Sequence, residues 1–176
     1  MRKLSTTDLN RLTISQYKEK EKNPVVVVLD NVRSFNNIGS IFRTSDAFAV
    51  KEILLCGISG TPPHKDIRKT AIGADKSVSW KYFSQTIEAV KTLKEEGYLL
   101  VAVEQTSESE ALSKTVLESK KPIALIFGNE INGVDDKVLE YCDLCVEIPQ
   151  FGTKHSFNVA ISVALVLWEL LRKESI

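Results

Sequence analysis

A chain of 176 residues, 43% hydrophobic and 26% charged, has the composition of one folded domain, which excludes a disordered tail protein, a collagen-like repeat and a disulfide-stapled miniprotein. Its 23 basic and 23 acidic side chains give a formal net charge of zero, so a role with nucleic acid must rest on a local basic patch. Three cysteines argue against an oxidised secreted framework, and the N-terminal residues lack the apolar run of a signal peptide.

Strand and helix patterns alternate along the chain. In chain order we expect a strand at 25–30, a helix at 37–48, a strand at 52–56, a loop at 60–63, a helix at 85–96, a strand at 98–103, a helix at 111–118, a strand at 123–127, a helix at 134–141, a strand at 144–148 and a helix at 159–171. This alternation predicts an α/β fold, a mostly parallel sheet with helices on both faces. We expect a short basic extension at 1–22 and one domain at 23–176.

The last predicted helix, 159–171, is apolar in almost every direction around its axis. Such a helix must be buried on more than one side, and a small domain offers few places for its outer face. We therefore expect it to form a subunit interface. Residues 157–171 contain polar residues and are shorter than the roughly 20 residues of a membrane span, so we expect a cytoplasmic protein with no membrane segment.

Charge is unevenly distributed. Basic residues are concentrated at 1–22 and 61–81, whereas 104–147 holds ten acidic residues and four lysines. Two basic stretches on a neutral protein indicate one positive face, which suits a phosphate backbone. The alternative is that they are solvated surface side chains.

Several familiar sites are excluded. A dinucleotide-binding glycine motif is missing, and the glycine-rich stretch 128–133 is followed by Val134 and Asp135 where a phosphate loop needs Lys and Ser or Thr. Cys142 and Cys145 have redox-pair spacing but precede a strand rather than open a helix, so we interpret them as structural. Only two histidines are present; we expect neither a metal site nor a Ser–His–Asp triad.

Polar clusters follow three predicted strands, at 31–43, 128–133 and 149–158. In open α/β sheets, ligands bind beyond the carboxyl ends of the strands. Glycines and asparagines also make ordinary turns and caps, and this is the simpler reading of any one cluster. Three clusters in the same topological position favour a binding site.

These clusters contain three ordered motifs. They comprise Asn31, Asn37, Gly39 and Arg43; then Phe127, Gly128, Glu130 and Gly133; then Ile148, Pro149, Gly152, Ser156, Asn158 and Val159. With these motifs, the chain from 25 to 172 resembles the SpoU (TrmH-like) RNA ribose 2′-O-methyltransferases of the SPOUT superfamily. It departs from the family pattern at Phe157, where leucine is usual, and at Ala160, where serine is common.

The resemblance implies a C-terminal deep trefoil knot, a homodimer packed through the knot region and the final helix, and S-adenosylmethionine bound largely by main-chain atoms. On this sequence the cofactor would contact Gly128, Ile148 and Phe157, while Gly133 and Gly152 would permit the turns.

The resemblance also implies a catalytic group. Arg43 would be the activating residue, and because guanidinium stays protonated we expect it to grip a phosphate and stabilise the developing alkoxide. Asn37 and Ser156 would orient the ribose or Arg43, and Asn158 and Glu130 would support the loops; a helix-capping role is the alternative for Glu130.

We expect the RNA backbone to contact the basic stretch after the second strand, through His64, Lys65, Arg68 and Lys69. Whether the RNA is tRNA or rRNA stays open. Two rival functions remain, a non-catalytic knotted RNA-binding protein and a nucleotide-binding α/β domain that uses another cofactor.

Overall fold

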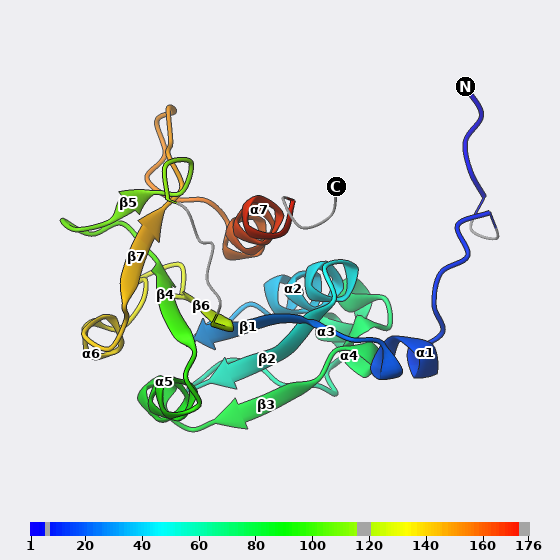
Figure 1. Cartoon of the computed structure of the whole chain (residues 1–176), viewed down its shortest axis with the longest axis horizontal. Helices are drawn as coiled ribbons and strands as arrows, with labels where there is room; N and C mark the ends of the chain where they lie inside the picture. The colour runs from blue at the N-terminus through cyan, green and yellow to red at the C-terminus, as the bar shows by residue number, and fades with distance from the viewer. Residues whose placement is uncertain (6–7, 116–120, 173–176) are drawn as a thin grey trace.

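The computed structural model describes residues 1–5, 8–115 and 121–172. In chain order its elements are α1 (Ile14–Glu19), β1 (Asn23–Asp30), α2 (Phe35–Ala47), β2 (Val50–Cys56), α3 (Lys65–Ala71), α4 (Ala74–Ser77), β3 (Trp80–Phe83), α5 (Thr86–Glu95), β4 (Leu99–Val103), β5 (Glu110–Ala111), β6 (Ile123–Phe127), α6 (Asp136–Leu139), β7 (Leu144–Glu147) and α7 (Val159–Leu171). Within the described ranges the strands form one sheet in the order β3-β2-β1-β6-β4-β7-β5, and its neighbouring strands pair in parallel (Figure 1).

The central strand β1 explains why helices cover both faces of the sheet. Its valines are buried without polar alternation, which is typical of a strand inside a parallel sheet. Val25 and Val27 face the core under α2, α3 and α7, whereas Val26 and Val28 face a second core under α5 and α6. The predicted fold class, a mostly parallel α/β sheet with helices on both faces, is confirmed (Figure 1). The trefoil knot stays a prediction.

Two predicted helices differ from the structure. The expected helix at 134–141 is only α6, because the backbone N–H of Val134 donates to Glu104 and the side chain of Asp135 caps the helix at Lys137. The expected helix at 111–118 is wrong at its start, where Glu110 and Ala111 pair with β7 as an edge strand. Residues 116–120 lie outside the described residues. The edge strand β3 and the short helix α1 were not predicted.

Helix α2 carries most of the first polar cluster, is capped at its start and is packed on two sides. Ser34 caps its first turn by accepting from the N–H of Asn37. A side chain at Gly39 would lie 2.1 Å from Thr70 Oγ1 and 2.3 Å from the Ile67 carbonyl oxygen, so glycine permits α3 to approach α2 closely. The other side of α2 packs against α7.

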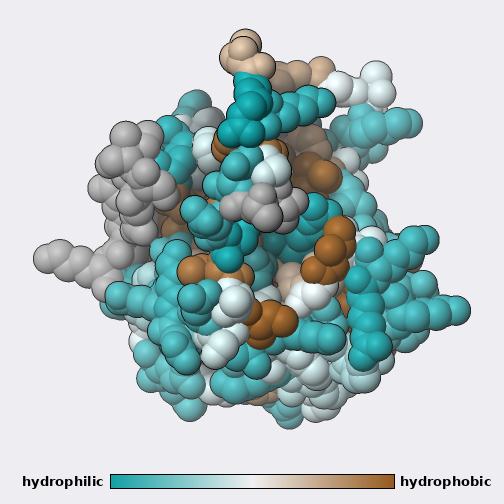
Figure 2. Space-filling view, turned by 90° about the vertical axis from the view of Figure 1, so that its right-hand side faces the viewer, coloured by the Kyte–Doolittle hydropathy of each residue, from teal (hydrophilic) through white to brown (hydrophobic). Residues whose placement is uncertain are grey.

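The N-terminal residues extend away from the sheet before α1, which buries Tyr17 against the core (Figure 1). On the face toward this segment, hydrophilic side chains surround a few separate apolar patches (Figure 2). The division of the chain after residue 22 stays a prediction. None of the helices in the described residues is long and apolar enough to cross a bilayer.

Candidate active site

A cavity of about 480 Å³ lies at the carboxyl ends of β4, β6 and β7. It is lined by the end of β4 and the residues that follow it (103–105), by the end of β6 and its loop (127–133), and by the end of β7 and its loop (147, 148 and 150). Five further lining residues are His155, Ser156, Phe157, Val159 and Ser162. This volume lies within the range of small-molecule and cofactor sites, roughly 300–1,000 Å³. The loops after β6 and β7, expected to converge from the sequence, do meet here.

The loop after β6 folds back on itself as one wall of the cavity. Asn129 and Gly133 form an antiparallel bridge, with N–H to carbonyl distances of 3.2 and 3.0 Å. A Cβ at Gly128 would lie 1.9 Å from the carbonyl carbon of Gly133, and Gly133 itself has a φ of +67°. Both glycines are therefore required by the geometry, the first by close approach and the second by a left-handed backbone.

Glu104 ties this wall to β4 and was not predicted as a site residue. Its Oε2 accepts from the N–H of Val134 at 3.0 Å, and its Oε1 accepts from the N–H of Gln105 at 2.8 Å. The side chain of Gln105 in turn donates to the carbonyl oxygen of His155 at 3.0 Å. The sequence signal for Glu104 is its position directly after a predicted buried strand, which the three polar clusters share.

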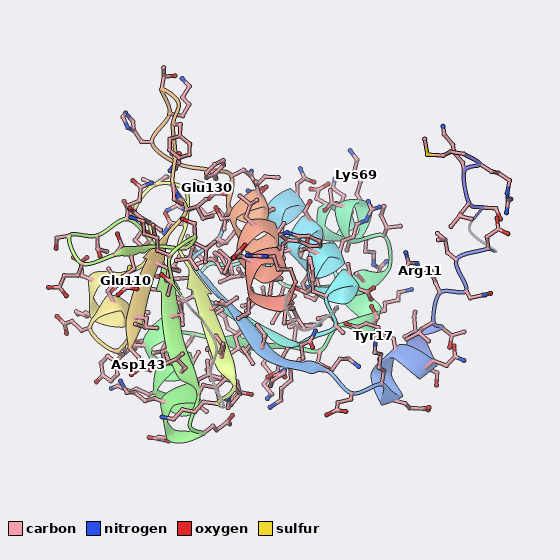
Figure 3. The ribbon with its side chains drawn as sticks, turned by 45° about the horizontal axis from the view of Figure 1, so that its top comes forward. Arg11, Tyr17, Lys69, Glu110, Glu130 and Asp143 are labelled. Carbon is pink, nitrogen blue, oxygen red and sulfur yellow. The ribbon has the colours of Figure 1, made fainter. Side chains whose placement is uncertain are left out.

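Asn37 connects the first and third clusters to the loop after β6. Its Nδ2 donates to Oε1 of Glu130 at 2.7 Å, and its Oδ1 accepts from Nδ2 of Asn158 at 3.1 Å. Oδ1 of Asn158 accepts from the N–H of Ala160 at 2.9 Å and so caps α7. Glu130 stands on its loop beside the start of α7 (Figure 3). One amide side chain thereby aligns three segments at the rim of the cavity.

The capping alternative for Glu130 is not what the structure has. The helix that follows it, α6, is capped by Asp135, whose Oδ1 accepts from the N–H of Lys137 at 2.9 Å. Glu130 instead lines the cavity and accepts from Asn37.

The predicted site residues fall into three groups. Those that line the cavity are Gly128, Glu130, Gly133, Ile148, Ser156 and Phe157. Asn37 and Asn158 join the rim through their hydrogen bonds. Arg43, Gly152, His64, Lys65, Arg68 and Lys69 lie outside the lining of this cavity. A Cβ at Gly152 would meet nothing within 4 Å, so the structure provides no steric reason for glycine there.

Arg43 lies on α2 six residues beyond Asn37, which places the two side chains about 120° apart around the helix axis. The Arg43 side chain is exposed. Within one copy of the chain, therefore, the guanidinium is not part of the cavity formed by the loops after β4, β6 and β7.

The three basic residues of α3, Lys65, Arg68 and Lys69, are exposed beside α2, with Lys69 pointing outward (Figure 3). His64 precedes them as the cap of α3, and its Nδ1 accepts from the N–H of Asp66 at 3.3 Å.

The cysteines have the surroundings of structural residues. Burial raises the pKa of Cys142 to about 12 and also raises the pKa of Cys145. Thiols that stay protonated at neutral pH are poor nucleophiles and metal ligands. In the described part of the chain, no group of three or more His, Cys, Asp or Glu side chains is placed to hold a metal ion.

Comparison with known proteins supports the motif assignment. A family model described as the SpoU rRNA Methylase family matches residues 24–168. A TrmH family tRNA/rRNA methyltransferase of Staphylococcus saprophyticus is 26% identical over 92% of this chain and 64% of its own length. The 23S rRNA (guanosine-2′-O-)-methyltransferase RlmB of Neisseria meningitidis is 29% identical over 85% of this chain and 59% of its own.

Solved structures are similar over most of the chain as well. An AdoMet-bound rRNA methyltransferase from Sinorhizobium meliloti superposes with a TM-score of 0.80 at 26% identity, covering 89% of this chain and 60% of that one. The chain thus spans about three fifths of the length of the two curated relatives and of this structure.

Proposed function

The chain belongs to the SpoU rRNA Methylase family, and on that premise we propose that it transfers a methyl group from S-adenosylmethionine to a ribose 2′-hydroxyl of RNA. The observation that carries this proposal is the cavity of about 480 Å³ whose rim holds Asn37, Glu130 and Asn158 in one hydrogen-bonded group. The names of the relatives support the RNA substrate class. Whether the RNA is tRNA or rRNA is left to experiment, and a cytoplasmic location stays a prediction.

The cavity fits S-adenosylmethionine in volume and in the character of its walls. Main-chain atoms of Gly128, Ile148 and Phe157 would hold it. The loop after β6 has no room for a side chain at Gly128, so its backbone lies bare toward the cavity. When bound, S-adenosylmethionine supplies an electrophilic methyl group. Glu104 would keep the wall at Gly133 and Val134 in place while the site fills and empties.

The polar rim would position the ribose. Ser156 and Asn37 carry groups that can both donate and accept, which suits a ribose hydroxyl. The hydrogen bonds to Glu130 and Asn158 fix the amide of Asn37, so it is oriented before RNA arrives. Holding reactants in the right geometry is a large part of catalysis of this kind.

Arg43 would stabilise the developing negative charge on the 2′-oxygen and grip the adjacent phosphate, because a guanidinium donates in a fixed fork and does not deprotonate at neutral pH. Since Arg43 is exposed and lies outside the cavity of its own chain, we assign it to the cavity of a second copy.

A homodimer through α7 would place two copies in this way. Ile161, Leu165 and Trp168 are spaced as one stripe of α7, and Trp168 is 59% exposed. An exposed apolar stripe of this size is typical of a subunit interface, and α7, which carries it, packs next to α2. The exposed face of α2 that carries Arg43 would then approach the partner.

The test is to measure S-adenosylmethionine binding by calorimetry, then methyl transfer to RNA extracted from cells that lack this protein, with the products identified by nucleoside mass spectrometry. A new 2′-O-methylated nucleoside supports the proposal. Binding without transfer would favour the non-catalytic alternative, and binding of NAD or ATP instead would favour another cofactor.

A further inference from the structure

A second hollow opens on the other side of the first turn of α2. It is shallow, has a volume of about 580 Å³, and is lined by the rings of Phe35, His64, Trp80 and Tyr82, together with Ile58 and the glycine-containing loop after β2. We name these four rings the aromatic surface. Nothing in the proposed methyl-transfer chemistry uses them.

The aromatic surface is rigid at its centre. The rings of Phe35 and His64 are stacked, with centroids 3.8 Å apart and planes inclined by 13°. A Cβ at Gly60 would lie 2.1 Å from Cε1 of Phe35, so the loop packs directly on the Phe35 ring. Tyr82 is anchored by its hydroxyl, which donates to the carbonyl oxygen of Gly57 at 2.9 Å. Rings held in this way lose little conformational freedom on binding a flat ligand.

Part of the aromatic surface is exposed to solvent and is not part of the buried core. Trp80 and Tyr82 alternate with Lys81 along the edge strand β3, so both face the side of the sheet that carries α2 and α3. Trp80 is half-buried against the core, but Tyr82 is 51% exposed and Ile58 is 58% exposed. Lys81 points to the other face and pairs with Glu52 at 3.0 Å.

Four basic residues flank Phe35 and His64 along the chain. Arg33 precedes Phe35 by two residues, and Lys65, Arg68 and Lys69 follow His64; all four are exposed. Asp66 on α3 is the one acidic residue in that helix, and its carboxylate lies 3.9 Å from Nδ1 of His64. The same Nδ1 accepts a hydrogen bond from the backbone N–H of Asp66. Aromatic rings next to cations are what single-stranded nucleic acid requires, since bases stack on the rings and phosphates pair with the cations. A neutral apolar peptide would form no ion pairs with these four basic side chains.

The first turn of α2 lies between the aromatic surface and the methyl-transfer site. Phe35 and Asn37 lie in the same turn of α2, one lining the shallow hollow and the other bonded to Glu130 at the rim of the cavity. The two hollows therefore flank one helix end. An RNA strand that crosses this helix end would meet both hollows.

We propose that the aromatic surface of Phe35, His64, Trp80 and Tyr82 stacks an unpaired base of the RNA substrate next to the methylated nucleotide. This inference rests on the proposed function and adds to it a requirement for single-stranded RNA at the site. It assigns His64 to base stacking and leaves the phosphate contacts to Lys65, Arg68 and Lys69.

The test uses single-stranded RNA decamers of one sequence that carry 2-aminopurine at successive positions, with matched decamers that are abasic at the same position. Two variants remove rings with little harm to the backbone: His64→Asn keeps a side-chain acceptor for the cap of α3, and Tyr82→Thr keeps a residue suited to a strand. Ile72→Asn, which removes an exposed apolar side chain at the end of α3 away from the rings, is the matched control.

At one position of the decamer, the wild-type protein should quench 2-aminopurine fluorescence and bind the intact RNA about tenfold more tightly than the abasic RNA. His64→Asn and Tyr82→Thr should lose the quenching and the preference while the salt dependence of binding stays unchanged, and Tyr82→Phe should restore both. A triple Lys65→Gln, Arg68→Gln, Lys69→Gln variant should keep the quenching and the preference for intact RNA. Its salt dependence of binding should be weaker, with the slope lowered by about 0.7 for each phosphate that the side chains no longer neutralise.

Equal affinity for intact and abasic RNA at every position, or full quenching in both ring variants, would overturn the inference. Calorimetry with S-adenosylmethionine separates this failure from failure of the proposed function. Cofactor binding and methyl transfer that persist without base stacking reject the aromatic surface alone, whereas a protein that binds no cofactor rejects the function.

Discussion

Asn37 and Glu130 lie 93 positions apart in the chain and are joined by a hydrogen bond of 2.7 Å. One comes from the first turn of α2 and the other from the loop after β6. Because the same amide also accepts from Asn158, its orientation is fixed from two sides. The motif spacing therefore corresponds to a physical contact between distant segments.

Exchanging the amide of Asn37 and the carboxylate of Glu130 should show whether methyl transfer depends on the hydrogen bond between them or on the position of the charge. Asn37→Asp sets a carboxylate against that of Glu130, and we expect the rate of methyl transfer to fall at least about tenfold as the rim is forced apart. Glu130→Gln keeps an acceptor for Asn37, so we expect its stability within about 0.5 kcal/mol of wild type. The double variant should recover part of the lost activity, because the new amide can donate to the new carboxylate. Strictly additive effects in this double-mutant cycle, measured by initial rates, would contradict a direct interaction.

Gly128→Ala should weaken S-adenosylmethionine binding at least about tenfold. The added methyl would lie 1.9 Å from the carbonyl carbon of Gly133, so the loop must move, at a cost of about 1–3 kcal/mol. Gly152→Ala is the matched control, since its Cβ meets nothing within 4 Å, and its affinity and stability should match wild type. Calorimetry and urea unfolding measure the two quantities. Equal cofactor affinity in both alanine variants would remove the loop after β6 from the binding site.

Glu104→Gln should weaken the binding of S-adenosylmethionine. The carboxylate accepts from two backbone N–H groups, at Gln105 and Val134, but an amide has one oxygen and turns its NH₂ toward the second donor. We expect an affinity loss of about tenfold, the equivalent of one hydrogen bond to a charged group, measured by calorimetry. Glu108→Gln, on the exposed part of the same connection, should bind as wild type does. A tight-binding Glu104→Gln protein would show that this wall holds without the bridge.

Arg43→Ala should lower methyl transfer about 100-fold or more while S-adenosylmethionine affinity is kept, since the lost charge acts on the transition state. If the guanidinium serves a second copy, mixing Arg43→Ala with Gly128→Ala should restore about a quarter of the wild-type rate, because half of the dimers are mixed and each has one complete site. A mixture as inactive as its components would show that Arg43 serves its own chain. Trp168→Ser should give monomers by sedimentation and lose the same activity.

Stability should fall at alkaline pH. Burial, with a smaller contribution from Asp30, raises the pKa of Cys56 from 9.0 to about 12. The unfolded chain releases this proton near pH 9 while the folded chain retains it, so the contribution is complete below pH 9 and is lost as pH rises toward 12. We expect Cys56→Ala to remove about 1 kcal/mol per pH unit from the slope of the unfolding free energy between pH 9 and 10. Tyr17, whose ordinary pKa is 10.0, also begins to contribute in this range, but its contribution is the same in the wild type and the variant. Urea unfolding across this range is the measurement; equal slopes would show that the thiol ionises freely.

Much of the architecture could be predicted because buried parallel strands have a simple signature. The run at 25–30 has no polar alternation, and it does form the centre of the sheet. The edge strands could not be found in this way. Trp80–Phe83 has two half-buried and two exposed residues, and Glu110–Ala111 is defined only by its pairing with β7. Their structure comes from neighbours that are distant in sequence.

The site was partly predictable for a related reason. Strand ends marked the loops that carry Gly128, Ile148 and Ser156, and these do line one cavity. Glu104 was missed because a single carboxylate after a strand has no motif around it, and its role depends on the backbone N–H of Val134, 30 positions away. Sequence spacing also could not tell on which side of α2 Arg43 would lie relative to the cavity of its own chain.

The side chain of Asn158 makes two contacts: it caps the start of α7 and donates a hydrogen bond to Asn37 at the rim of the cavity. If two copies associate through α7, the affinity of each cavity for its ligand and the dimerisation constant become linked quantities, and each must change the other by the same factor. Dilution of the protein would then alter its apparent cofactor affinity without any change in the residues that touch the cofactor.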